Sequence, residues 1–277
     1  MSLTPDRVKF LEQKCRQFRI DLINLLHDIQ TGHPGGSLSC TEILTTLYFE
    51  KMNINPKNFK SADRDRFILS KGHAAPMLYI ILAEMGFFPK EELKSLRQIN
   101  SRLQGHPCAE KTPGVELSTG PLGLGISAAV GMAAVAKADK TENFIYALMG
   151  DGEIQEGIVW EAAMAASKYK LDNLIAIIDN NGVQLDGTIE EIMPLGILKD
   201  KWQAFGWHVL ESDGHDIKEF SNTIDAAKLL KHKPIAIIAH TIKGKGISFM
   251  EGKNEWHGKA IGDEEYAKAL SELGGEH

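Results

Sequence analysis

Two short polar segments each follow an apolar run that has the character of a buried strand. Gly150-Asp151-Gly152 comes directly after Phe144–Met149, and Asn180-Asn181-Gly182-Val183 follows Leu174–Asp179 about thirty residues later. A carboxylate, an amide oxygen and a backbone carbonyl suit Mg²⁺, and glycines let a phosphate approach the backbone. Either segment alone is typical of an ordinary turn. Their occurrence at successive strand ends favours a metal and phosphate site.

Four histidines lie beside glycine in segments between the predicted helices and strands. Such positions allow an imidazole to point into a cleft, where it can hydrogen-bond hydroxyl groups and transfer protons near pH 7. For a lone histidine, pattern alone favours a structural or surface role. His215, in Asp-Gly-His-Asp, is typical of a turn and a helix cap. The four candidates are His33, His73, His106 and His257.

The elements that must position these residues are short strands alternating with helices. Strands that are apolar on both faces and alternate with helices predict a parallel sheet covered on both sides. The predicted fold class is therefore α/β, a doubly wound, mainly parallel sheet with helices on both faces. Ligands of such sheets bind beyond the carboxyl ends of the strands. The predicted strands are Phe67–Leu69, Phe144–Met149, Leu174–Asp179, Trp207–Leu210 and Ile235–Ala239.

Helical patterns frame both ends of the chain. Apolar residues at three- and four-residue steps from Val8 to Ile29 predict an amphipathic helix, with Thr4 and Pro5 at its start. A second helix is predicted over 263–273. The Gly- and Lys-rich stretch 241–262 lacks a regular pattern and predicts a functional loop. No repeat or linker divides the sequence, so we expect one domain over residues 1–277.

The composition is that of a globular protein with a small-molecule ligand. The 277 residues are 43% hydrophobic and 25% charged, and the net charge of −6 is spread along the chain, which argues against nucleic acid and anionic membranes as partners. No apolar run approaches the roughly 20 residues that a membrane span needs, and no export signal is seen. The three cysteines lack metal or disulfide spacing. We expect a cytoplasmic protein with reduced thiols.

Six motifs together resemble the transketolase family. The segment from Gly150 to Gly187 resembles the thiamine diphosphate motif, which begins with GDG and ends near NN. TGHPGGSLS, SKGHAAPMLY, QGHPC, STGPLGLG and TIKGKGISFMEGKNEWHG occur in the order that this family shows. Their agreement makes the resemblance specific, and it covers the family's N-terminal, diphosphate-binding domain. The fold expected is thus the thiamine-diphosphate-binding fold.

The resemblance implies a site for thiamine diphosphate and Mg²⁺. Asp151, the side chain of Asn181 and the carbonyl of Val183 would bind Mg²⁺, and Gly152 would contact the diphosphate. The catalytic residues would be the four histidines, which would hydrogen-bond sugar hydroxyls and relay protons. The remaining contacts to the cofactor would come from His73, Gly120, Pro121, Leu122, Asn181, Lys243 and His257.

Three segments bear on the contacts to the cofactor. Where the human-like pattern of the family has serine three positions after the first histidine, this chain has Gly36, so a backbone N–H would have to replace that cofactor contact. Lys243 lies in a lysine-rich loop that is typical of solvated surface, and only the WHG ending of the motif selects it. The GPLGLG segment beginning at Gly120 has GxxGxG spacing and no preceding strand, which argues against dinucleotide binding.

The resemblance also implies that this chain is half of an enzyme. Transketolases transfer a two-carbon ketol unit from a ketose phosphate to an aldose phosphate, with the cofactor as electron sink. The glutamate that activates the cofactor and the arginines that bind sugar phosphates belong to the family's second domain. We therefore expect a separate C-terminal subunit with the pyrimidine-binding domain, in an α2β2 assembly. Glu156 and Glu161 match family residues at the subunit interface.

Alternatives stay open within and outside this class. A related enzyme could use another sugar phosphate, such as apulose 4-phosphate or deoxyxylulose 5-phosphate, although the paired HP motifs favour transketolase over the deoxyxylulose enzyme. A scaffold that binds the cofactor without catalysis is disfavoured because the metal-binding and histidine residues occur together. A nicotinamide oxidoreductase is disfavoured by the glycine spacing.

Overall fold

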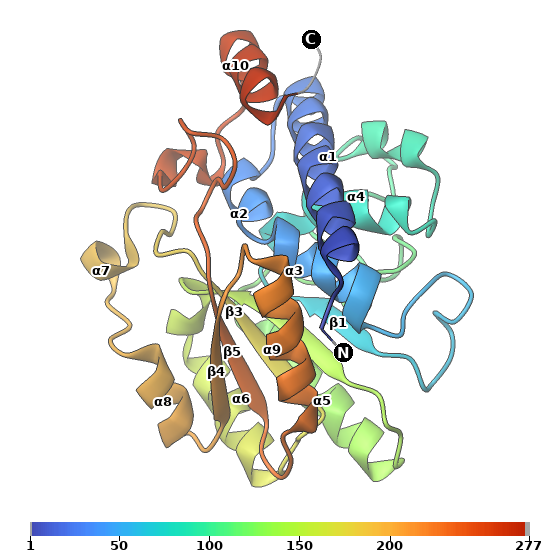
Figure 1. The fold of residues 1–277 in the computed structure, drawn as a ribbon, viewed down its shortest axis with the longest axis vertical. Helices are drawn as coiled ribbons and strands as arrows, with labels where there is room; N and C mark the ends of the chain where they lie inside the picture. The colour runs from blue at the N-terminus through green and yellow to red at the C-terminus, as the bar shows by residue number, and fades with distance from the viewer. Residues whose placement is uncertain (1, 275–277) are drawn as a thin grey trace.

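A five-stranded parallel sheet forms the centre of the molecule in the computed structural model, which describes residues 2–274 (Figure 1). The strand order is β1-β2-β3-β5-β4, and every neighbouring pair is parallel. All five predicted strands are confirmed. The strands are β1 (Arg66–Leu69), β2 (Ile145–Gly150), β3 (Leu174–Asn180), β4 (His208–Asp213) and β5 (Ile235–His240).

The edge strand β4 is longer than predicted. It continues to Asp213, whereas the apolar run ends at Leu210. Glu211 and Asp213 fit an edge strand because β4 pairs only with β5. Polar residues on an edge also discourage pairing with another chain.

Helices cover both faces of the sheet, as the doubly wound fold class requires. Successive strand residues point to opposite faces, so Leu148 and Ile177 join one apolar core while Met149 and Ile178 join the other. The first core includes α1 (Pro5–Ile29), α3 (Thr41–Thr46), α4 (Ala75–Glu84) and α9 (Ile217–Leu229), and the second includes α5 (Leu124–Ala138), α6 (Gly157–Lys168) and α8 (Leu198–Ala204).

The two terminal helices are also confirmed, and they pack together (Figure 1). The Thr4 hydroxyl accepts a hydrogen bond from the Arg7 N–H, so Thr4 caps α1 as predicted. Helix α10 (Asp263–Leu273) returns to α1, where Arg16 Nε donates to the Leu273 carbonyl. The shorter helical segments are α2 (Pro34–Ser39), η1 (Leu47–Lys51), η2 (Gly72–Ala74), η3 (Lys90–Ser95), η4 (Glu153–Gln155), α7 (Ile189–Ile192) and η5 (Asn254–His257).

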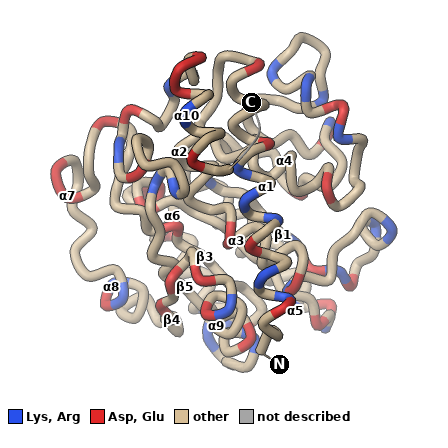
Figure 2. The backbone as a smooth tube through the Cα atoms, turned by 45° about the horizontal axis from the view of Figure 1, so that its top comes forward, with Lys and Arg blue, Asp and Glu red and all other residues tan. Residues whose placement is uncertain are grey.

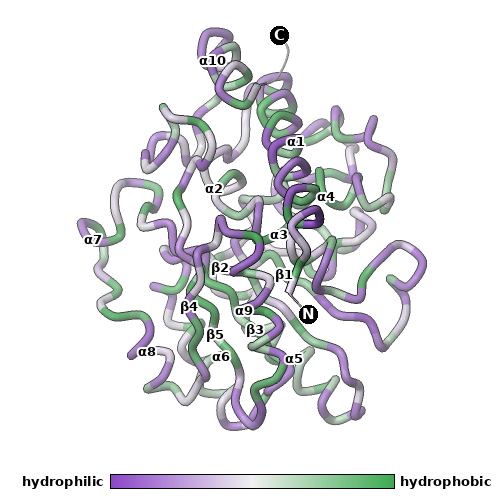
Figure 3. The backbone as a smooth tube through the Cα atoms, in the orientation of Figure 1, coloured by the Kyte–Doolittle hydropathy of each residue, from purple (hydrophilic) through white to green (hydrophobic). Residues whose placement is uncertain are grey.

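Charge and hydropathy are distributed as the composition suggests. Acidic and basic residues alternate over the elements without forming a single-sign stripe (Figure 2), and the hydrophobic segments gather in the sheet and in the helices beside it (Figure 3). Within residues 2–274, no helix combines the length and the apolar run that crossing a bilayer requires. The thiols of Cys15, Cys40 and Cys108 are free.

Candidate active site

The carboxyl edge of the sheet borders a cavity of about 400 Å³. The turns that follow β2 and β3 line it, together with segments from α2, η2 and η5, so every sequence motif contributes to one site. Pro121 is the one predicted site residue that does not line the cavity, although Gly120 and Leu122 on either side do. The predicted residues that line it are His33, His73, His106, Gly120, Leu122, Asp151, Gly152, Asn181, Val183, Lys243 and His257.

Asp151 joins the turns after β2 and β3. Its Oδ1 accepts a hydrogen bond from the Gly152 N–H at 2.8 Å, and its Oδ2 accepts one from the Gly182 N–H at 2.6 Å. Burial, and then the charge of the neighbouring Asp179, raise the pKa of the Asp151 carboxyl to about 6, although these two hydrogen bonds act to lower it. A carboxylate that is costly to ionise in isolation is suited to a bound cation.

The oxygen atoms around Asp151 fit a hard cation. Asn181 Oδ1 accepts a hydrogen bond from the Val183 N–H at 3.1 Å, which places this amide oxygen in the same turn as the Val183 carbonyl. Among residues 2–274, no three His, Cys, Asp or Glu side chains form a metal cluster. The predicted set is of another kind, with one carboxylate, one amide oxygen and one carbonyl, and Mg²⁺ accepts such a set when phosphate oxygens and water complete it.

Lys243 is buried at this site and is not a surface lysine, because its side chain and backbone together are only 2% exposed. Its Nζ donates to the Val183 carbonyl at 3.2 Å and lies 3.0 Å from His257 Nδ1. Burial, and then the charge of Lys71, lower the pKa of Lys243 to about 8. A buried ammonium group beside two glycine-rich turns is suited to binding an anion such as a diphosphate.

The four predicted histidines form one cluster. Their ring centroids lie 5.0 Å apart for His73 and His257, 5.4 Å for His33 and His257, and 6.2 Å for His33 and His106. Burial is the first cause that lowers the pKa of each ring, to about 4 for His33 and about 3 for His257, and nearby cations add to it. The rings are therefore neutral near pH 7 and can both donate and accept hydrogen bonds.

This neutrality predicts a loss of stability in acid. Because the folded-state pKa of His257 lies below its ordinary value of 6.5, the unfolded chain binds a proton that the folded chain does not between pH 6.5 and about 3. The stabilising contribution is present above pH 6.5 and is lost as the pH falls. Urea unfolding at pH 7, 5.5 and 4 should show a shallower loss for His257→Asn than for the wild type. The exposed His232→Asn should follow the wild type, and equal slopes for all three would contradict the assignment of a neutral ring.

Several residues that the sequence analysis missed complete the site. Lys71 Nζ forms an ion pair with Asp179 and donates to the Gly36 carbonyl at 2.8 Å. Asp179 also accepts hydrogen bonds from the hydroxyls of Ser39, at 2.6 Å, and Thr241. The signal was the position of Lys71 in the SKGH motif, where it is the second residue after β1. The buried pair ties β1, α2, β3 and the end of β5 together beneath the cavity.

Glu153 was also missed. Its buried carboxylate accepts hydrogen bonds from the Gly150 and Gly123 N–H groups at 3.1 and 2.9 Å, and from Ser70. Gly123 has φ of +82°, and a Cβ there would lie 2.7 Å from Ile158 Cγ2. Glu153 therefore links the turn after β2 to the start of α5, where the glycine-rich turn needs glycine.

The predicted helix-cap role of His215 is wrong. Asp216 caps α9, because its Oδ1 accepts a hydrogen bond from the Glu219 N–H at 2.8 Å. His215 lies in the turn before it and contacts Glu42 and Ile242 instead. The sequence Asp-Gly-His-Asp offers several side chains that can cap a helix, and only the geometry separates them.

A doubly wound parallel sheet with a polar cavity beyond the carboxyl ends of its strands is the arrangement in which α/β domains bind their ligands. The family described as "Transketolase, thiamine diphosphate binding domain" matches residues 11–277. The chain belongs to this family.

This chain matches some relatives over nearly their whole length and others over less than half of it. It is 45% identical to an apulose-4-phosphate transketolase subunit of Phocaeicola vulgatus, covering 96% of this chain and 95% of that protein. It is 48% identical to a 6-deoxy-6-sulfo-D-fructose transketolase subunit of Clostridium sp., covering 95% and 96%. The human transketolase is 42% identical, and the match covers 93% of this chain but 41% of that protein. The transketolase structure from Campylobacter jejuni superposes with a TM-score of 0.91 at 35% identity, covering 97% of this chain and 43% of that one.

Proposed function

We propose that this chain is the N-terminal subunit of a split transketolase that depends on thiamine diphosphate and Mg²⁺. Residues 1–277 would form its single diphosphate-binding domain, working in the cytoplasm. The reaction would move a two-carbon ketol unit from a ketose phosphate to an aldose phosphate. The observation that carries the proposal is the single cavity that brings together the oxygen donors, Lys243 and four neutral histidines.

Each side chain has a distinct proposed task. Asp151, the Asn181 amide oxygen and the Val183 carbonyl would hold Mg²⁺, while Gly152 and Lys243 would contact the diphosphate. When bound, the cofactor supplies the electron sink that carbon–carbon bond cleavage requires. His73 and His257 would contact cofactor and substrate. His33 and His106, nearer Arg97, would hydrogen-bond sugar hydroxyls and relay protons.

The surroundings of the cavity support a second chain. Leu122 and Leu185 line the cavity and yet are 39% and 57% exposed, and Met193, whose carbonyl accepts a hydrogen bond from the cavity residue Gln155, is 55% exposed. Glu156, which also lines the cavity, and Glu161 are exposed. Apolar side chains of this size around a polar cavity are typical of a protein interface. We propose that the pyrimidine-binding subunit covers this rim, in an α2β2 assembly.

An activity assay tests the proposal. With thiamine diphosphate, Mg²⁺, a ketose donor and an aldose acceptor, this chain mixed with a C-terminal transketolase subunit from the same genome should turn over, and either chain alone should not. The donors should include xylulose 5-phosphate, apulose 4-phosphate and 6-deoxy-6-sulfo-D-fructose, since two relatives carry the last two names. Turnover by this chain alone at the rate of the mixture would contradict the split architecture.

Gly36 provides a further prediction, because a Cβ at this position would lie 3.0 Å from His73 Nε2. Both Gly36→Ala and Gly36→Ser should displace the His73 ring by a few tenths of an ångström and lower kcat/KM of the mixture on the order of threefold to tenfold. Steady-state kinetics of both variants measure this. If Gly36→Ser raised kcat/KM while Gly36→Ala lowered it, the serine hydroxyl would be restoring the family contact, and the steric account would fail.

A further inference from the structure

The backbone around Lys243 is held from outside the cavity. Gly244 donates its N–H to the Gly35 carbonyl at 3.1 Å, and a Cβ at Gly246 would lie 3.0 Å from Arg19 Cδ. Gly244 and Gly246 both have positive φ, so the turn needs glycine at each place. The turn therefore has little freedom, and the contacts on either side of Lys243 decide where its ammonium group lies.

Arg19 and His215 contact this turn and both bind Glu42, and we call the three side chains the Arg19–Glu42–His215 cluster. Arg19 and Glu42 are buried and form a two-fold ion pair with N–O distances of 2.5 and 2.8 Å. His215 Nδ1 lies 2.9 Å from Glu42 Oε2, the oxygen that also accepts from Arg19 Nη2. None of the three lines the cavity.

The cluster forms hydrogen bonds with the backbone on both sides of Lys243. The Ile242 N–H donates to His215 Nε2 at 2.8 Å, and Arg19 Nε donates to the Lys245 carbonyl at 2.9 Å. The residue before Lys243 and the second residue after it are thus bound to the same buried cluster. Helix α1, helix α3 and the turn before α9 supply its members.

The hydrogen bonds also fix the tautomer of His215. Because a backbone N–H can only donate, Nε2 must be unprotonated, so the proton lies on Nδ1 and is donated to Glu42. Burial raises the pKa of Glu42, but the charge of Arg19 and the hydrogen bonds from His215 and Arg19 outweigh it and lower the pKa to about 2. Glu42 therefore stays ionised and keeps His215 in the tautomer that accepts from Ile242.

We propose that His215 is a positioning residue for the cofactor site, acting through the Ile242 N–H to place Lys243. This inference rests on the proposed function, since it concerns the diphosphate contact of Lys243. Ile242 is exposed, so its N–H can bond to water when His215 is replaced. The effect on folding should therefore be small, while the effect on ligand binding should not.

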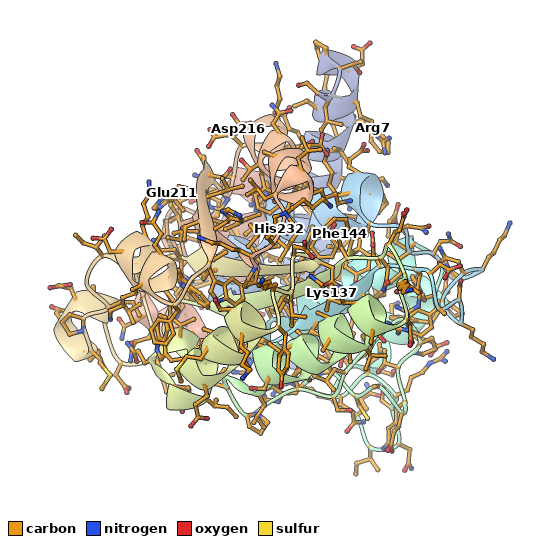
Figure 4. The ribbon with its side chains drawn as sticks, turned by 90° about the horizontal axis from the view of Figure 1, so that it is seen from below. Arg7, Lys137, Phe144, Glu211, Asp216 and His232 are labelled. Carbon is orange, nitrogen blue, oxygen red and sulfur yellow. The ribbon has the colours of Figure 1, made fainter. Side chains whose placement is uncertain are left out.

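Two substitutions separate the two hydrogen bonds of His215. His215→Asn can keep a donor near the Nδ1 position for Glu42 but has no atom near Nε2 for Ile242. His215→Gln can place an amide oxygen near the Nε2 position and loses the donor to Glu42. His232→Asn is the matched control: His232 is exposed, lies before β5 at the opposite edge of the sheet, and has φ of +73°, which asparagine tolerates (Figure 4).

Two readouts are measured on the full chain. Hydrogen exchange without ligand should be on the order of tenfold faster for the peptide containing Ile242 in His215→Asn, with the thermal midpoint within a few degrees of the wild type. Calorimetry of the mixture with the C-terminal subunit should show that this variant binds thiamine diphosphate with Mg²⁺ about fivefold more weakly. His215→Gln should lie nearer the wild type, and His232→Asn should equal it.

A double mutant decides whether the effect runs through Lys243. Adding His215→Asn to Lys243→Met should weaken binding no further than Lys243→Met alone, because the ammonium group to be positioned is gone. Additive losses in the double mutant would overturn the inference, and so would wild-type binding by His215→Asn. If His215→Asn does not fold, a fivefold loss of binding in His215→Gln without faster exchange of Ile242 would overturn it. If the wild-type mixture binds no thiamine diphosphate, the proposed function fails and the inference fails with it.

Discussion

Replacing Asp151 by asparagine should weaken the binding of thiamine diphosphate with Mg²⁺ by roughly a hundredfold or more. Asp151 is the only carboxylate in the proposed oxygen set, and an amide supplies a neutral oxygen where the cation needs an anionic one. Calorimetric titration of the mixture with the C-terminal subunit measures the change. Asp200→Asn, on the exposed surface of α8, is the matched control and should bind as the wild type.

The ligand-free stability of Asp151→Asn should change little. The amide nitrogen would oppose the N–H of Gly152 or Gly182, which destabilises the turn, but the substitution also removes the like charge beside buried Asp179. Because these effects oppose each other, we expect a thermal midpoint close to that of the wild type. With the midpoint unchanged, a loss of binding cannot be attributed to unfolding. A variant that is still stabilised by Mg²⁺ and thiamine diphosphate as much as the wild type would remove Asp151 from the metal site.

Replacing Lys71 by methionine should destabilise the fold by about 3–5 kcal/mol, measured by urea unfolding. The side chain of Lys71 is 1% exposed, and its partner Asp179 is fully buried. Methionine preserves the volume but leaves the Asp179 carboxylate without its cation, and the hydroxyls of Ser39 and Thr241 remain as its main donors. The Gly36 carbonyl also loses the hydrogen bond from Lys71 Nζ, one of the contacts that hold α2, so α2 should loosen.

A second substitution tests that reason. Combining Lys71→Met with Asp179→Asn removes the uncompensated charge and should recover more than half of the lost stability. Lys60→Met, on the exposed surface before β1, should leave the free energy of unfolding within about 0.5 kcal/mol of the wild type. A double variant as unstable as Lys71→Met alone would show that the ion pair is not the cause.

The sequence predicted the fold well because its buried strands are apolar on both faces. The runs ending at Leu69, Met149 and Ala239 are short, apolar and followed by polar or glycine-rich residues, which favours buried strands, and glycine beside each histidine marked the cavity segments. The end of β4 was missed because an edge strand tolerates polar residues, so Glu211 and Asp213 gave no strand signal. Strands can thus be predicted from the sequence where burial on both faces restricts their residues to apolar types.

The parts of the site that were missed depend on contacts between distant segments. Lys71 and Asp179 are 108 residues apart, and neither residue type indicates a buried partner until the fold brings them together. Lys243 could be selected only through the family motif, because a lysine in a glycine-rich loop is normally solvated. Pro121 was included with its neighbours, but alternate residues of a tight turn face different ways, and only Gly120 and Leu122 face the cavity.

Calorimetric titration with thiamine diphosphate and Mg²⁺ tests the central claim most directly. The samples are this chain alone, this chain mixed with the C-terminal transketolase subunit, and the same mixture with Asp151→Asn. We predict tight binding in the wild-type mixture, much weaker binding to the chain alone because half of the site is missing, and loss of binding in the variant mixture. A folded wild-type mixture that binds no cofactor would contradict the assignment of this cavity as a thiamine diphosphate site.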